Sequence, residues 1–192
     1  AVLSQVINKV ATSTALSASA NPANEGASVT WTATVSGSSP SGSVTFKDGS
    51  TTLGTTTLTA GVASYTSSTL SAGSHNITAV YGGDANNTTS TSSVLSQVIN
   101  VVAVPSTTSL SASANPASVG ASVTWSATVT GSSPSGTVTF KDGATTLGTG
   151  TLSAGVASYT SSALSVGSHN ITAEYAGDAK NLASTSAVLS QV

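Results

Sequence analysis

The chain has 192 residues, of which only 5% are charged, and its formal net charge is -2. So little charge excludes electrostatic binding of nucleic acid or of an anionic membrane surface, and the absence of cysteine excludes a disulfide framework. No apolar run approaches the roughly 20 residues that a membrane-spanning helix requires, so we expect no membrane insertion. Because the charge is so low, we also expect no nucleic-acid partner.

The sequence is dominated by an internal repeat. Residues 16–98 align without a gap with residues 110–192, and 67 of these 83 positions are identical. The segment Val-Leu-Ser-Gln-Val-Ile-Asn occurs at 2–8 and again at 94–100, and its first five residues recur at 188–192. We therefore divide the chain into residues 1–10, a linker or the trailing strand of a preceding repeat, residues 11–100, repeat 1, and residues 101–192, repeat 2. We interpret the whole as a window onto a longer array.

Each repeat contains short runs of β-forming residues separated by turn signals every 8–12 residues, which is typical of a β-sandwich. The strands predicted for repeat 1 lie at 12–19, 27–35, 43–47, 51–58, 62–67, 74–81 and 88–99. Asp48-Gly49 provides the backbone conformation of a tight hairpin turn between two of them. No segment has the apolar periodicity of an amphipathic helix.

Strict alternation along these strands predicts which side chains face the interior. Large aromatic side chains share a face with aliphatic ones, so we expect a structural core around Trp31, Phe46, Tyr81, Trp125, Phe140 and Tyr175. Positions that differ between the repeats, such as Val80 and Glu174, fall on faces expected to be outward. The sequence therefore predicts a conserved dry interior and a surface rich in serine and threonine.

Two blocks carry a family resemblance: Gly-Ser-Val-Thr-Phe-Lys-Asp-Gly-Ser-Thr-Thr-Leu-Gly at 42–54, and Leu-Ser-Ala-Gly-Ser-His-Asn-Ile-Thr-Ala-Val-Tyr-Gly-Gly-Asp at 70–84. Together they resemble the bacterial immunoglobulin-like domain repeats of large secreted and cell-surface proteins. The resemblance implies seven-stranded sandwiches, tandem arrays and extracellular or cell-surface placement. The predicted fold class is all-β, with two tandem immunoglobulin-like Greek-key β-sandwiches arranged end to end.

The two histidines, His75 and His169, occupy the same place in their repeats. In sandwiches of this type that position usually holds a tyrosine whose polar tip bonds the backbone at a sheet corner. We expect each histidine to play this corner role. The alternative is a catalytic base, but a triad also requires an orienting acid, and no local nucleophile signature accompanies the histidines.

Asp84 and Asp178 lie in the loop that follows the penultimate long strand. Calcium requires six to eight oxygen ligands, whereas each loop offers one carboxylate, and the second loop contains Lys180. We expect these residues to cap a turn, with a weak calcium site as the alternative. No catalytic residue, cofactor or other metal site is predicted.

The function predicted from these observations is that of a non-enzymatic structural repeat, forming a semi-rigid extracellular shaft or spacer of a large bacterial surface or secreted protein. Its partners would be the neighbouring repeats of the same chain. One alternative is a self-assembling fibre, in which identical chains are the partners, because low charge opposes association little. A second is a carbohydrate-binding accessory module of a glycan-active enzyme, which would require outward aromatic platforms that the alternation does not provide.

Overall fold

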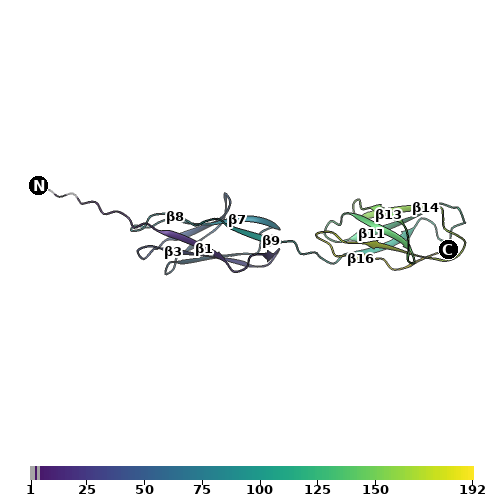
Figure 1. Ribbon diagram of the computed structural model, residues 1–192, viewed down its shortest axis with the longest axis horizontal. Coiled ribbons are helices and arrows are strands. Elements are labelled where there is room, and N and C mark those ends of the chain that lie inside the picture. Colours follow the sequence, from purple (N-terminus) through teal and green to yellow (C-terminus); the bar gives the residue numbers. More distant parts are fainter. Residues whose placement is uncertain (1–2, 4) are drawn as a thin grey trace. The chain divides into compact units, whose positions relative to one another are not determined.

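The computed structural model describes residue 3 and residues 5–192, and within them every regular element is a β-strand. No helix in this part of the chain is long and apolar enough to cross a membrane. Two compact parts are present, unit 1 (Ala1–Val101) and unit 2 (Val102–Val192), and each consists of two layers of strands (Figure 1). The predicted all-β fold is confirmed.

Unit 1 packs a small sheet against a larger one. Its strands are β1 (Ser13–Ala18), β2 (Ala23–Asn24), β3 (Val29–Ser36), β4 (Ser43–Asp48), β5 (Thr51–Thr57), β6 (Val62–Ser67), β7 (Gly73–Tyr81), β8 (Ser90–Thr91) and β9 (Leu95–Asn100). The 3-stranded sheet has the order β1-β3-β6, and the 6-stranded sheet has the order β2-β9-β7-β4-β5, with β8 also paired to β7. Every pairing is antiparallel except that of β2 with β9, which is parallel.

Unit 2 repeats this arrangement with small differences. Its strands are β10 (Thr107–Ala112), β11 (Val123–Thr130), β12 (Thr137–Asp142), β13 (Thr145–Thr151), β14 (Val156–Ser161), β15 (His169–Tyr175), β16 (Ser184–Thr185) and β17 (Leu189–Gln191). The 3-stranded sheet has the order β10-β11-β14, and the 5-stranded sheet has the order β13-β12-β15-β16, with β17 also paired to β15. The strand β15 is two residues shorter at its start than β7, and no strand corresponds to β2 among the residues that the structure describes in this unit.

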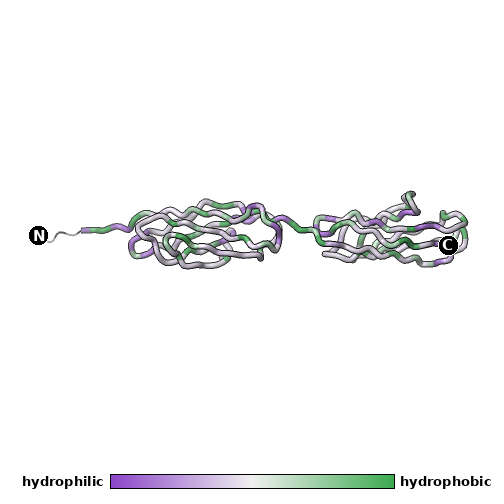
Figure 2. Tube along the Cα trace, turned by 90° about the horizontal axis from the view of Figure 1, so that it is seen from below, coloured by the Kyte–Doolittle hydropathy of each residue, from purple (hydrophilic) through white to green (hydrophobic). Residues whose placement is uncertain are grey.

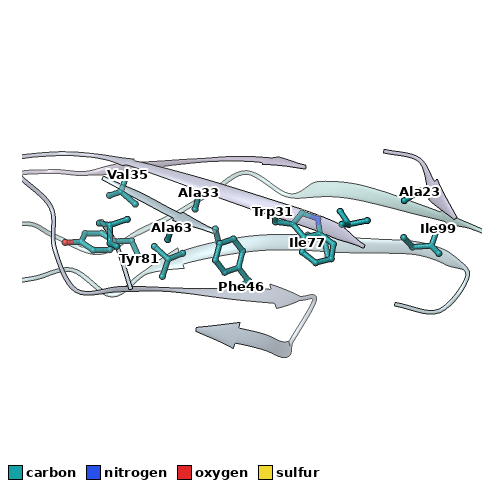
Figure 3. Packing of buried hydrophobic residues seen from close by; sticks show 13 residues of the cluster. Ala23, Trp31, Ala33, Val35, Phe46, Ala63, Ile77, Tyr81 and Ile99 are labelled. Carbon is teal, nitrogen blue, oxygen red and sulfur yellow. The ribbon is translucent and has the colours of Figure 1, made fainter. Parts of the chain in front are cut away.

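The core of unit 1 lies between the two sheets, and the side chains of Trp31, Phe46 and Tyr81 within it are 0% exposed (Figure 3). The ring of Tyr65 stacks between two of them, with centroids 6.4 Å from Trp31 and 5.9 Å from Phe46. Unit 2 repeats the cluster with its own aromatic side chains, which are Trp125, Phe140, Tyr159 and Tyr175. Alternating side chains thus enclose an apolar interior in each unit.

The structure corrects the last predicted strand of repeat 1. The expected strand at 88–99 is broken into β8 and β9, because Ser92 interrupts the pairing between them. Its side-chain Oγ accepts a hydrogen bond from the amide of Ala79 at 3.0 Å. In a regular ladder a backbone carbonyl would accept this bond. The two-residue strand β2 was not predicted, so unit 1 has nine strands where the resemblance implied seven.

Candidate functional site

The two ends of each unit contain the polar side chains singled out from the sequence. In unit 1 we call the end at which β1 begins the N-terminal pole, and the end at which β9 finishes the C-terminal pole; the equivalent ends of unit 2 take the same names. Strand β7 runs from the C-terminal pole, where Gly73 pairs with Ile99, to the N-terminal pole, where Tyr81 pairs with Ser90. The first residue of β1 lies opposite Ser36, at the other end of the unit from Ile99.

Asp84 organises the loop at the N-terminal pole of unit 1. Its carboxylate accepts hydrogen bonds from six groups, which are the amide and hydroxyl of Ser41, the hydroxyl of Tyr81, the amide of Asn86, and the amide and side chain of Asn87, all at 2.8–3.0 Å. Burial of the carboxylate opposes ionisation, but these donors outweigh it and hold the pKa of Asp84 well below its usual range. The geometry is that of an ionised turn-capping aspartate.

Asp178 occupies the same position in unit 2. It accepts hydrogen bonds from the amide and hydroxyl of Ser135 at 2.9 Å and from the amide of Lys180 at 2.8 Å. Its pKa is also lowered well below the usual range, again because hydrogen bonds outweigh the effect of burial. Within the described residues, no group of three histidine, cysteine, aspartate or glutamate side chains could hold a metal ion. The carboxylates of both aspartates accept hydrogen bonds from their own loop and from the neighbouring loop that contains Ser41 or Ser135.

Asn87, which the sequence analysis did not single out, fixes the same loop to its neighbour. This side chain is 0% exposed. Its Oδ1 accepts from the amide of Ser38 at 2.8 Å, and its Nδ2 donates to the carbonyl of Ser38 at 3.0 Å. Asn181 makes the same pair of bonds with Ser132 in unit 2. The retention of an asparagine in both otherwise variable loops was the available signal, since the positions on either side of it differ between the repeats.

The chain that leads into each unit is attached to this loop. In unit 1 the amide of Val10 donates to the carbonyl of Asn86 at 2.7 Å, and the amide of Thr88 donates to the carbonyl of Val10 at 2.9 Å. Val104 makes the equivalent bonds in unit 2. Only residues 101–103 therefore separate the end of β9 from the first residue held by unit 2, and Figure 2 shows this linker as a hydrophobic stretch.

At the C-terminal pole, β9 is held by side chains as well as by its neighbours β7 and β2. The side chain of Asn21 donates to the carbonyl of Ser96 at 2.7 Å and accepts from the amide of Val98 at 2.9 Å, as a strand backbone would. The side chain of Gln97 is 0% exposed and donates to the carbonyl of Ala20 at 3.0 Å. Gln97 alternates with Leu95 and Ile99 along the strand and therefore lies on their inward face. A glutamine on this face was the sequence signal for the buried polar contact.

His75 also lies at the C-terminal pole, where it connects two turns. Its Nδ1 is 2.6 Å from Oδ2 of Asp48, and its Nε2 is 2.8 Å from the carbonyl of Ser71. Both partners are acceptors, so the protonated imidazole, which carries a hydrogen on each nitrogen, satisfies both contacts. The hydrogen bond to Asp48 and the one to Ser71 raise the pKa of His75.

His169 repeats this arrangement with Asp142 at 2.6 Å and the carbonyl of Ser165 at 3.0 Å, and its pKa is also raised, first by the aspartate and then by the carbonyl. The hydroxyl of Ser165 lies 3.5 Å from Nε2. A histidine whose two nitrogens both donate cannot accept the proton of a serine, so this geometry does not form a nucleophile and base pair.

One known protein family and several solved structures are similar to this chain. The family described as bacterial Ig-like domain (group 3) matches residues 16–100 and 110–192. Similar solved structures include fibronectin(III)-like modules of Clostridium thermocellum CbhA, 20% identical over 92% of this chain and 94% of that one, with a TM-score of 0.37. The human OSCAR ligand-binding domain is 17% identical over 93% of this chain and 97% of that one, with a TM-score of 0.36.

A search of characterised proteins finds no match. Domains of this fold are typically non-catalytic, and those of this family usually occur in extracellular or surface proteins. The family match covers most of the chain in two separate copies, one in each unit. The chain therefore belongs to the bacterial immunoglobulin-like domain family (group 3), with two tandem domains.

Proposed function

We propose that this chain is a non-enzymatic, load-bearing segment in the shaft of an extracellular bacterial protein. The observation that carries the proposal is the placement of the two chain ends in unit 1. The chain enters at the N-terminal pole through Val10 and leaves at the C-terminal pole through β9, so that the core lies between its points of attachment. Strand β7, which joins the two poles, has nine residues and spans roughly 30 Å.

Tension applied through these points acts along the strands. Strand β9 is parallel to β2, with Ala23 opposite Ile99 and Asn24 opposite Asn100. Because β2 connects back to the N-terminal pole through β1, pulling the ends apart shears the β2–β9 hydrogen bonds rather than opening them one at a time. The amide of Glu25, which donates to the carbonyl of Asn100 at 2.9 Å, and the two bonds from Asn21 reinforce this contact. Several bonds must therefore break together.

The polar side chains that could serve in catalysis, Asp84 and His75, make hydrogen bonds within the domain. Asp84 accepts hydrogen bonds from its own loop, from Ser41 and from Tyr81, and both ring nitrogens of His75 lie against acceptors. Trp31, Phe46 and Tyr81 are enclosed in the core, which leaves them no role as sugar-stacking platforms. These observations support a mechanical role over an enzymatic or carbohydrate-binding one.

Single-molecule force spectroscopy on the full chain, held at its two ends, tests the proposal. We expect two unfolding events, one for each unit. Each event should lengthen the chain by roughly 270–300 Å, since about 90 residues extend at 3.3–3.6 Å each and roughly 30 Å is already spanned in the folded unit. Unfolding without resolvable force peaks would contradict a load-bearing role.

A change in pulling direction supplies the control. Attachment of unit 1 through Ser50→Cys and Asn100→Cys applies force between two points at the C-terminal pole, because the β4–β5 turn lies there beside Asn76. This geometry peels β5 and β4 from the sheet, breaking bonds one after another, and we expect a clearly lower unfolding force. Equal forces in the two directions would show that strand shear is not the source of resistance. Labelling of intact cells with an antibody against this segment tests the extracellular placement.

A further inference from the structure

Asn76 lies on the outward face of β7, where its backbone is fixed but its side chain is not. The amide of Asn76 donates to Oδ1 of Asp48 at 3.0 Å, and its carbonyl accepts from the amide of Gly49 at 2.9 Å. The side chain is exposed and makes no hydrogen bond to any residue that the structure describes. Asn170 has the same backbone bonds, with Asp142 and Gly143, and the same exposed side chain. Each unit therefore presents one free carboxamide at a rigid position.

Small residues surround both of these asparagines. Ser96 in β9 lies opposite Asn76, and Ser74 precedes it on the same face of β7. On the other side, the turn residue bonded to the carbonyl of Asn76 is a glycine and has no side chain. In unit 2 the residue opposite Asn170 is again a serine, Ser190. A bulky group on either carboxamide would therefore displace no large neighbouring side chain.

Both asparagines begin the tripeptide Asn-Ile-Thr, at 76–78 and at 170–172. The pattern Asn-X-Ser/Thr is the acceptor sequence for N-linked sugars. Because side chains alternate along a strand, Asn76 and Thr78 share the outward face, whereas Ile77 between them is 0% exposed in the core. The two groups that the acceptor sequence requires, the carboxamide and the hydroxyl, are therefore displayed together on the surface.

Two other acceptor sequences, which begin at Asn86 and Asn87, differ from this one in their surroundings. Asn87 is 0% exposed and its carboxamide is bonded to the neighbouring loop, so it cannot carry a sugar in the folded unit. Asn86 is exposed, but the hydroxyl of Thr88 in its sequence accepts a hydrogen bond at 3.3 Å from the chain that enters the unit. Unit 2 has Lys180 in place of Asn86. The acceptor sequence that recurs in both units is thus the one with an exposed, unbonded carboxamide.

We propose that Asn76 and Asn170 are sites of N-linked glycosylation. The co-substrate is a sugar activated on a nucleotide diphosphate or a lipid diphosphate, and a glycosyltransferase of the cell brings it to the asparagine. Nδ2 attacks C1 of the sugar, so that a bond forms between C1 and nitrogen and the bond from C1 to the phosphate oxygen breaks. The diphosphate leaves with the electron pair, and Nδ2 loses one proton.

The attached sugars would hydrate a surface that contains little charge. Only 5% of the residues of the chain are charged, and sugars on asparagine are bulky and solubilising groups. Attachment at Asn76 leaves the core and the pairing of β7 with β9 in place, because the side chain that carries the sugar takes part in neither. The inference is independent of the load-bearing role proposed above.

Mass spectrometry of the chain purified from the bacterium that produces it tests the proposal. Enzymatic release of N-linked sugars in heavy-oxygen water converts each modified asparagine to a labelled aspartate. Peptides from the two sites can be told apart, because Val80 follows the first and Glu174 follows the second. We expect the label at positions 76 and 170 and none at position 87.

Variants produced in the same bacterium identify the groups that are required. Thr78→Val removes the hydroxyl but keeps a branched side chain that suits a strand, and it should abolish the sugar at Asn76. Asn170 should remain modified in the same molecule and serves as the internal reference. Thr78→Ser, the matched control, keeps the hydroxyl on a smaller side chain and should retain the sugar at Asn76, which separates loss of the hydroxyl from a disturbance of the strand.

A chain without any sugar on asparagine would overturn the proposal. Sugars found only on serine or threonine would do so as well, and so would label at positions 86 or 87 in place of 76 and 170. Undiminished modification of Asn76 in Thr78→Val would show that the tripeptide is not the acceptor sequence.

Discussion

Substituting Gly54 by alanine tests whether the aromatic stack decides the packing of unit 1. Gly54 lies in β5 beneath the ring of Tyr65, and an added Cβ would lie 2.8 Å from Cδ2 of that ring and closer still to Cε2. The ring cannot retreat easily, because it is stacked against Trp31 and Phe46. Gly54→Ala therefore forces the stack apart.

The expected loss of stability of unit 1 follows from two opposing effects. Overpacking a close-packed core costs about 1–3 kcal/mol, and loss of glycine's freedom in the unfolded chain returns about 0.4–1 kcal/mol. We expect unit 1 to lose about 1–2 kcal/mol, which is a factor of roughly 5–30 in its folded-to-unfolded ratio. Hydrogen exchange measured by mass spectrometry should show faster exchange in β3 and β6, while β11 and β14 of the unmodified unit 2 serve as a reference in the same molecule.

Two variants decide whether the reasoning is correct. Gly82→Ala meets nothing closer than the carbonyl of Ser43 at 3.9 Å, and unit 2 carries alanine at this position, so its stability should stay within about 0.5 kcal/mol of the parent chain. In a Tyr65→Leu background the ring is gone, and the cost of Gly54→Ala should fall by about 1 kcal/mol or more. An unchanged cost in that background would refute the steric explanation.

Three other predictions concern the poles. The pKa of each histidine is raised on folding, so its stabilising effect is complete below the unfolded value of about 6.5 and is lost as the pH rises through the folded pKa. The urea midpoint should therefore decrease from about pH 6 to about pH 9, and the double variant His75→Gln, His169→Gln should flatten this dependence; an unchanged slope would contradict the assignment. Asn87→Ala removes a buried side chain and its two hydrogen bonds to the backbone of Ser38 and should cost unit 1 about 1–3 kcal/mol in urea denaturation, against less than about 0.5 kcal/mol for the exposed Asn86→Ala, and equal losses would contradict the role given to the buried amide. Ile99→Ala should cost about 2–4 kcal/mol by the same assay, because this side chain is 4% exposed at the end of the core, and a near-neutral result would contradict its place in the core.

The local sequence pattern was sufficient to predict the fold class and the family. Alternation with a period of two residues depends only on the pleat of a strand, so the order of residues alone places Val29, Trp31 and Ala33 on one face. The turn at Asp48-Gly49 was equally local, and Gly49 has a positive φ of 55°. The break at Ser92 could not be predicted, because a serine in a polar run gives no sign that its hydroxyl will replace a backbone carbonyl of another strand.

The repeat, the longer strands and the face on which their side chains lie could be predicted from the sequence, because they follow from neighbours in the chain; the short strand β2 and the break between β8 and β9 could not. How the poles are held depends instead on tertiary contacts. The bond from Ser38 to Asn87 joins residues 49 positions apart, and that from Val98 to Asn21 joins residues 77 apart. Such contacts depend on which strands become neighbours, a property of the whole sandwich that no local pattern contains.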